Sequence, residues 1–172
     1  MSVGHILVGL CIAAALGVLA VRGAAIARER FALRDRTNAT LLETATVRIG
    51  DTVFRVEVAR HDADRIRGLS GRPFLAPGSG MLFIFDREDI HQIWMRDMRF
   101  PIDLIWMSGE QVVDVTERLP VPAAGASEAD TPRFSPHQPA LLVLEVPAGT
   151  VAALKIHSGQ PFKVTFDGLN GG

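Results

Sequence analysis

The first part of the chain is apolar on every side. Residues 6–21 read ILVGLCIAAALGVLAV and contain no charged side chain. A helix of this length rises about 24 Å at about 1.5 Å per residue, which approaches the ~30 Å thickness of a bilayer core. A helix that packs against the core of a globular domain usually has a polar face toward solvent, and this run has none. The pattern predicts one transmembrane or signal helix in residues 1–27, with residues 3–27 in contact with the membrane.

The flanks of this segment leave cleavage and orientation open. Residues 25–27 (Ala-Ile-Ala) fit a small-x-small cleavage site, but Arg22 interrupts the approach to it. Arginines follow the segment at residues 22–36 and none precedes it. Taken alone, the positive-inside bias places the rest of the chain in the cytoplasm. We favour an uncleaved anchor over a cleaved signal peptide.

From Thr44 the period of the apolar positions changes to two. Residues 46–49, a Gly50-Asp51 turn and residues 52–58 have the pattern of a β-hairpin. A second hairpin is predicted from residues 102–107 and 111–116, which a Ser-Gly-Glu turn connects. Alternation therefore predicts β-structure for the first half of the domain and for its centre.

The remaining segments are short. Helices are predicted at residues 61–69, with Asp62 as a possible N-cap, and at residues 148–157. Further strands are predicted at residues 81–85, 91–95, 141–146 and 161–166, and a long proline-rich loop at residues 120–139. The pattern indicates a polar connector (28–43), a mostly β domain (44–167) and a flexible tail (168–172). The expected fold is a small β-barrel or sandwich with two short helices.

Composition narrows the function classes. The 172 residues carry 18 Lys and Arg against 19 Asp and Glu, which argues against a nucleic-acid-binding protein with a basic face. The single cysteine, Cys11, lies in the apolar segment, so the domain has no disulfide, zinc cluster or cysteine nucleophile. The sequence also contains no nucleophile elbow, phosphate-binding glycine loop or dinucleotide motif. We expect no cofactor, and we lean against an enzyme.

Several short motifs occur in one order along the domain. They are Arg67-Gly68-Leu69, Gly80-Met81-Leu82-Phe83, Trp94-Met95, Pro101-Ile102-Asp103, Leu144-Glu145 before Ala148-Gly149, and Ile156-x-x-Gly159. Over about residues 47–164 the series resembles the bacterial and archaeal domain-of-unknown-function family 192 (DUF192). Ser70 and residues 96–98 depart from the family pattern, which usually has Met and Lys-Asn-Thr there.

The resemblance implies a compact, mostly β domain that commonly follows a signal peptide or anchor, without an established reaction. It favours the extracytoplasmic side despite the arginines. We therefore expect a protein anchored in the inner membrane with its domain in the periplasm, or one secreted to the periplasm. The cytoplasmic face of the membrane is the alternative.

The densest group of unusual side chains is HQIWMRDMRFPID, residues 91–103. One interpretation is structural, with Trp94 and Phe100 in the core and the arginines in solvent. The other is a binding surface in which Trp94 is a stacking wall, and Arg67 or Arg96 holds a carboxylate or phosphate. The binding candidates are Arg67, Trp94, Met95, Arg96, Asp103 and Glu145.

Asp103 and Glu145 lie beside apolar strand residues. A buried carboxylate needs a partner, and we expect an arginine to pair with each. An enzyme with a polar site at Asp103, Glu145 and Arg67 is the alternative.

A third interpretation is a soft-metal site. His91, Met95 and Met98 offer ligands suited to copper(I), provided that the chain turns near Asp97, because residues three apart on a strand face opposite sides. The leading interpretation remains a non-catalytic domain that binds a small ligand or an envelope protein.

Overall fold

The computed structural model describes residues 42–123 and 125–168. The membrane segment predicted in residues 1–27 lies outside these ranges, as do most of the connector and of the tail. Neither helix in the described ranges is long and apolar enough to cross a membrane.

The described domain is mostly β, as the residue pattern predicts, and contains two short helices. The elements, in chain order, are β1 (Thr44–Ile49), β2 (Thr52–Ala59), α2 (Asp62–Arg67), β3 (Ser79–Asp89), β4 (Ile93–Trp94), β5 (Ile102–Ser108), β6 (Gln111–Leu119), β7 (Arg133–Phe134), β8 (Ala140–Pro147), α3 (Thr150–Leu154) and β9 (Phe162–Phe166).

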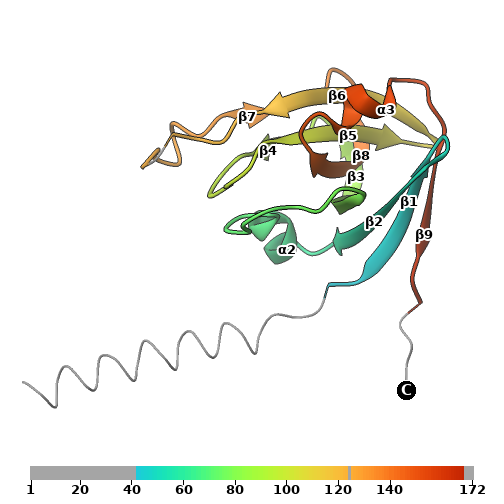
Figure 1. The fold of residues 1–172 in the computed structure, drawn as a ribbon, viewed down its shortest axis with the longest axis horizontal. Coiled ribbons are helices and arrows are strands. Elements are labelled where there is room, and N and C mark those ends of the chain that lie inside the picture. The colour runs from blue at the N-terminus through green and yellow to red at the C-terminus, as the bar shows by residue number, and fades with distance from the viewer. Residues whose placement is uncertain (1–41, 124, 169–172) are drawn as a thin grey trace, which may run out of the picture. The chain divides into compact units, whose positions relative to one another are not determined.

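Seven of the strands form one curled sheet in the order β6-β5-β8-β3-β2-β1-β9 (Figure 1). An isolated antiparallel bridge connects Gln111, at the start of β6, with Pro161, the residue before β9. β4 and β7 form a separate two-stranded sheet. Of the two expected architectures, the structure is therefore the barrel type, a half-barrel made from one curled sheet.

Both predicted hairpins are present. β1 pairs with β2 around the turn at Gly50, whose φ of 56° is in the left-handed region that glycine adopts without strain. β5 pairs with β6 across the predicted turn at residues 108–110. The pairings between distant segments are β2 parallel to β3, and β8 between β3 and β5.

Several predicted boundaries are wrong. The first helix spans Asp62–Arg67, with His61 rather than Asp62 as its N-cap and Gly68 as its C-cap. The Asp62 carboxylate is paired with Arg65 one turn later. The second helix is shorter than residues 148–157, and the strand predicted at residues 91–95 is only Ile93–Trp94. Local pattern places elements more reliably than it places their ends.

The large sheet has apolar side chains on both faces. Leu82, Ile105 and Leu144 belong to one cluster of buried residues, whereas Met81 and Trp106, their neighbours along the strands, belong to a second cluster. Successive strand residues point to opposite faces, so two apolar faces explain the uninterrupted apolar runs of β3 and β5. Segments around α2, β4 and β7 cover the second face, and the candidate site lies in this layer.

Candidate functional site

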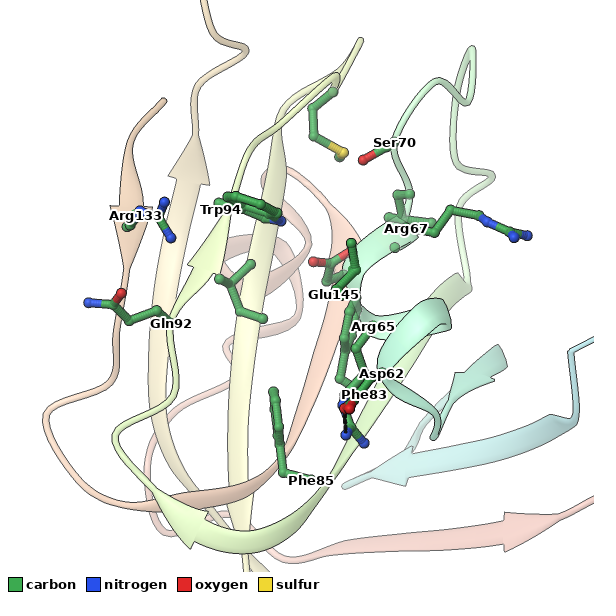
Figure 2. A pocket seen from close by; sticks show the side chains of 15 residues that line it. Asp62, Arg65, Arg67, Ser70, Phe83, Phe85, Gln92, Trp94, Arg133 and Glu145 are labelled. Carbon is green, nitrogen blue, oxygen red and sulfur yellow. Dashed lines mark hydrogen bonds and ion pairs between the residues drawn. The ribbon is translucent and has the colours of Figure 1, made fainter. Parts of the chain in front are cut away.

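A cavity of about 320 Å³ lies between the second face of the sheet and the segments that cover it (Figure 2). Residues of α2 and the turn after it form one wall, and β3 and β4 supply aromatic and apolar side chains. Arg133 of β7 and Glu145 of β8 complete the lining. The cavity therefore brings together residues from 62 to 145, including segments of β7 and β8 that are far from α2 in the sequence.

Glu145 is the unusual residue of this cavity. Glu145 is only 4% exposed, and its Oε2 atom has no hydrogen-bond partner among the described residues. The strand β8 holds it in place, because Glu145 is paired with Met81 of β3 on one side and with Leu104 of β5 on the other. Burial raises the pKa of Glu145 to about 8, although the nearby Arg72 acts to lower it. The carboxyl group is therefore mostly protonated at neutral pH.

Arg72 does not neutralise Glu145, because it is paired with Glu57. Its Nη1 and Nη2 atoms donate to the two carboxylate oxygens of Glu57 at 2.5 and 2.6 Å. These hydrogen bonds lower the pKa of Glu57 and raise that of Arg72. Both Nη atoms of Arg72 are thus bonded to the Glu57 carboxylate, and Arg72 acts on Glu145 only through the electric field of its charge.

Trp94 forms an aromatic wall of the cavity, and two guanidinium groups lie against its ring. The guanidinium carbon of Arg96 is 4.3 Å from the ring centroid, and that of Arg133 is 5.0 Å away. Trp94 is half-buried, so its interpretation as a core residue is wrong. The fully buried tryptophan is Trp106, whose Nε1 donates to Thr116 Oγ1 at 2.9 Å.

Phe85 forms the other aromatic wall. The His91 ring stacks on it with the centroids 3.6 Å apart, and the Arg65 guanidinium carbon lies 5.5 Å from its centroid. Arg65 also donates to the Ile84 carbonyl oxygen at 2.7 Å and pairs with Asp62. The Arg65 charge is therefore already compensated within the protein.

The structure brings three of the six predicted binding residues together. Arg67, Trp94 and Glu145 all line the cavity, although Figure 2 shows the Arg67 side chain extending away from it. Arg96 borders a neighbouring depression and packs on Trp94. Met95 is fully buried in the second apolar cluster.

The Asp103 carboxylate accepts hydrogen bonds from two backbone N–H groups. Its Oδ1 accepts a hydrogen bond from the Arg118 backbone N–H at 2.7 Å, and its Oδ2 accepts one from the Val151 N–H at 2.9 Å. The arginine pairing predicted for both carboxylates is wrong: within the described ranges neither Asp103 nor Glu145 has an arginine salt bridge. Backbone donors satisfy Asp103, whereas Glu145 has no such donor at Oε2.

The proposed copper ligands are divided between two places. The chain turns at Asp97, where φ is 55°, so Met95 and Met98 both lie in the second apolar cluster. His91 instead packs on Phe85, with its Nε2 2.9 Å from the Arg87 carbonyl oxygen. In the part of the chain that the structure describes, no group of three or more His, Cys, Asp or Glu residues could hold a metal ion.

The sequence interpretation missed several lining residues. Phe83 and Phe85 alternate with Leu82 and Ile84, so the period of two could have placed both rings on one face of β3. Arg133 comes from the proline-rich segment and reaches Trp94 through the pairing of β4 with β7. No local signal indicates that pairing.

The comparisons with known proteins agree with this fold. The family DUF192, described as "Uncharacterized ACR, COG1430", matches residues 45–164. A crystal structure of a protein of unknown function from Novosphingobium aromaticivorans DSM 12444 is 27% identical, with a TM-score of 0.64, and the match covers 73% of this chain and 89% of that one. A protein from Sinorhizobium meliloti 1021, described as a "putative transcription regulator", is 25% identical with a TM-score of 0.61, covering 71% and 92% respectively. No curated protein matches the chain.

Proposed function

The chain belongs to the DUF192 family of uncharacterised proteins, and we propose that its domain is a non-catalytic binding domain whose small ligand occupies the cavity at Glu145. One observation carries the proposal. Glu145 is 4% exposed, lines a cavity of about 320 Å³ and has a carboxylate oxygen without a partner among the described residues. Leaving such a group unsatisfied costs about 1–3 kcal/mol, so a ligand that bonds to it gains this energy.

The arrangement of the carboxylates supports binding over catalysis. An enzyme site in which Asp103 and Glu145 act together as acid and base needs both carboxylates within reach of one substrate. Asp103 is fully buried, does not line the cavity and uses both oxygens for backbone N–H groups. The alternative enzyme site of Asp103, Glu145 and Arg67 would have to break these two bonds.

The two tryptophans allow a direct test of binding. Their indole N–H groups give separate signals in a ¹H–¹⁵N NMR spectrum, and a Trp94→Phe variant identifies the Trp94 signal. A set of uncharged, cationic and anionic fragments is titrated into the full-length protein in detergent. We expect at least one fragment to shift the Trp94 signal and leave that of Trp106, which is buried and bonded to Thr116. If every fragment leaves the Trp94 signal in place, the binding function is wrong.

We also propose that residues 3–27 tether the domain to the inner membrane, with the domain in the periplasm, or direct its secretion there. The uncharged run at residues 6–21 supports this placement. A reporter that is active only outside the cytoplasm, fused to the C-terminus, tests it. Activity confined to a cytoplasmic reporter would instead support the alternative, a domain on the cytoplasmic face.

The description of the Sinorhizobium relative refers to transcription. The 18 basic and 19 acidic residues of this chain support a ligand other than nucleic acid. We expect no salt-dependent binding of duplex DNA to the domain in a fluorescence-anisotropy titration.

A further inference from the structure

The aromatic walls of the cavity already face positive charges of the protein itself. Arg96 and Arg133 lie against Trp94, and Arg65 lies near Phe85. An aromatic cage for a ligand cation needs free ring faces. Arg96 and Arg133 already lie over the Trp94 ring, so a cationic ligand would have to displace a guanidinium group, and the cavity is poorly suited to it.

The cavity is equally unsuited to an anion. The charged groups that face Glu145 or line the cavity are Asp62, Arg65 and Arg67 on α2, Arg72 in the following loop, and Arg133 on β7. Arg65 is bonded to two backbone oxygens and to Asp62, and Arg72 is bonded to Glu57. The Arg67 side chain extends away from the cavity (Figure 2). Arg133 lies over the Trp94 ring and is paired with Glu128. The guanidinium groups that line the cavity are therefore occupied or directed elsewhere.

What the cavity offers is a set of neutral hydrogen-bonding groups. A protonated Glu145 carboxyl presents an O–H donor and a carbonyl acceptor side by side. Trp94 also lines the cavity, and in Figure 2 its indole nitrogen lies on the side of the ring that faces Glu145. Phe83, Phe85 and Met98 supply apolar surface around these groups.

On the basis of the proposed function, we propose that the ligand is a small uncharged molecule with a flat apolar body and an amide-type group that pairs with Glu145. The Glu145 O–H donates to the ligand carbonyl, and the ligand N–H donates to the other carboxyl oxygen. The Trp94 N–H is a second donor for the carbonyl. Both polar atoms of the ligand group are thereby hydrogen-bonded.

The size of the cavity agrees with such a ligand. A dry cavity of about 150 Å³ is enough to bind benzene, and this one measures about 320 Å³. Benzamide, benzamidinium and benzoate share one shape and differ in charge, so they separate the effect of charge from that of size.

The test titrates these three probes into the full-length protein in detergent at about pH 6.5 and follows the two indole signals. We expect benzamide to shift the Trp94 signal, with an affinity at least about tenfold above those of benzamidinium and benzoate, which corresponds to ~1.4 kcal/mol. Tighter binding of either charged probe overturns the proposed ligand class and leaves the binding function standing. If none of the probes shifts the Trp94 signal, while other fragments do, the ligand class is again wrong. If no fragment of any charge shifts it, the binding function is wrong as well.

Two variants at Glu145 sharpen the result. Glu145→Gln keeps a neutral donor beside an acceptor, so it should bind benzamide within about threefold of the parent. Glu145→Leu has a similar volume and no polar atoms, and should lose at least about tenfold in benzamide affinity. Equal benzamide affinity in the parent and in Glu145→Leu would show that the carboxyl does not contact the ligand. The comparison of the three probes on the unmodified protein stands if either variant fails to fold.

Discussion

A Cβ atom built on Gly80 would lie 2.7 Å from the backbone oxygen of Glu145. The same atom would lie 2.8 Å from Leu144 Cδ1, and both distances are shorter than real Cβ contacts. Gly80 is fully buried in β3 beside β8, so the missing side chain lets the two strands approach. The glycine of the Gly80-Met81-Leu82-Phe83 motif thus sets the position of the strand that carries Glu145.

Gly80→Ala should destabilise the domain by about 1–3 kcal/mol, because the added methyl group meets backbone rather than a flexible side chain. Urea unfolding measures the change. Gly168→Ala is the matched control, since nothing lies within 4 Å of its Cβ position, and its stability should match that of the parent. Equal stability of the Gly80 variant and the control would show that β8 can move away at little cost.

The stability of the domain should fall as pH rises through the range set by Glu145. Its pKa is about 8 in the folded state against an ordinary value of 4.5, so between these values the folded protein holds a proton that unfolding releases. Stability is therefore lost with increasing pH, at up to about 1.4 kcal/mol per pH unit.

Glu145→Gln removes this contribution. In urea unfolding from about pH 5 to about pH 8, the parent should lose stability relative to the variant. Glu57, Asp89 and Asp114 have lowered pKa values and contribute only at acid pH, in both proteins alike. Parallel curves for the two proteins would mean that Glu145 is ionised at neutral pH.

Asp103→Asn should cost about 1–3 kcal/mol, because an amide can accept from only one of the two backbone N–H groups and turns its NH₂ toward the other. The donors at Arg118 and Val151 lie on β6 and α3. Asp51→Asn, in the exposed turn after β1, is the control and should leave the unfolding free energy unchanged. Weakened amide protection from hydrogen exchange at Val151 in the Asp103 variant would identify the bond involved.

The two tryptophans should differ in their contribution to stability. Trp106→Ala removes a fully buried ring and its bond to Thr116, and should cost about 3–5 kcal/mol. Trp94→Ala removes a half-buried ring and should cost about half as much. Thermal or urea unfolding of both variants gives the comparison, and an equal or greater cost at Trp94 contradicts it.

Arg72 should hold the pKa of Glu145 below the value that burial alone would produce. Replacing the ion pair by Arg72→Met with Glu57→Gln removes one positive and one negative charge, and the pKa of Glu145 should rise because Arg72 is the charge acting on it. The ¹³C shift of the Glu145 carboxyl group against pH measures this change. Arg55→Met, at an exposed position of β2, is the control and should leave that pKa unaltered.

The sequence by itself determined the two hairpins and the class of the domain, whereas β7 lies in the segment predicted as a loop. Alternating apolar residues predicted both hairpins, β1–β2 and β5–β6, and the glycines at their turns marked where each chain reversal occurs. Six short motifs in order were enough to indicate the family, which the match over residues 45–164 confirms. These features depend on neighbours within a few residues, which is why they can be read from a linear pattern.

The tertiary structure decided which side chains meet. The insertion of β8 between β3 and β5 buries Glu145, and the pairing of β4 with β7 places Arg133 on Trp94. The sequence marks Asp103 and Glu145 as similar carboxylates on apolar strands, but one receives two backbone N–H groups and the other faces a cavity. The partners of a buried group come from segments far away along the chain, and their approach depends on the packing of the whole sheet.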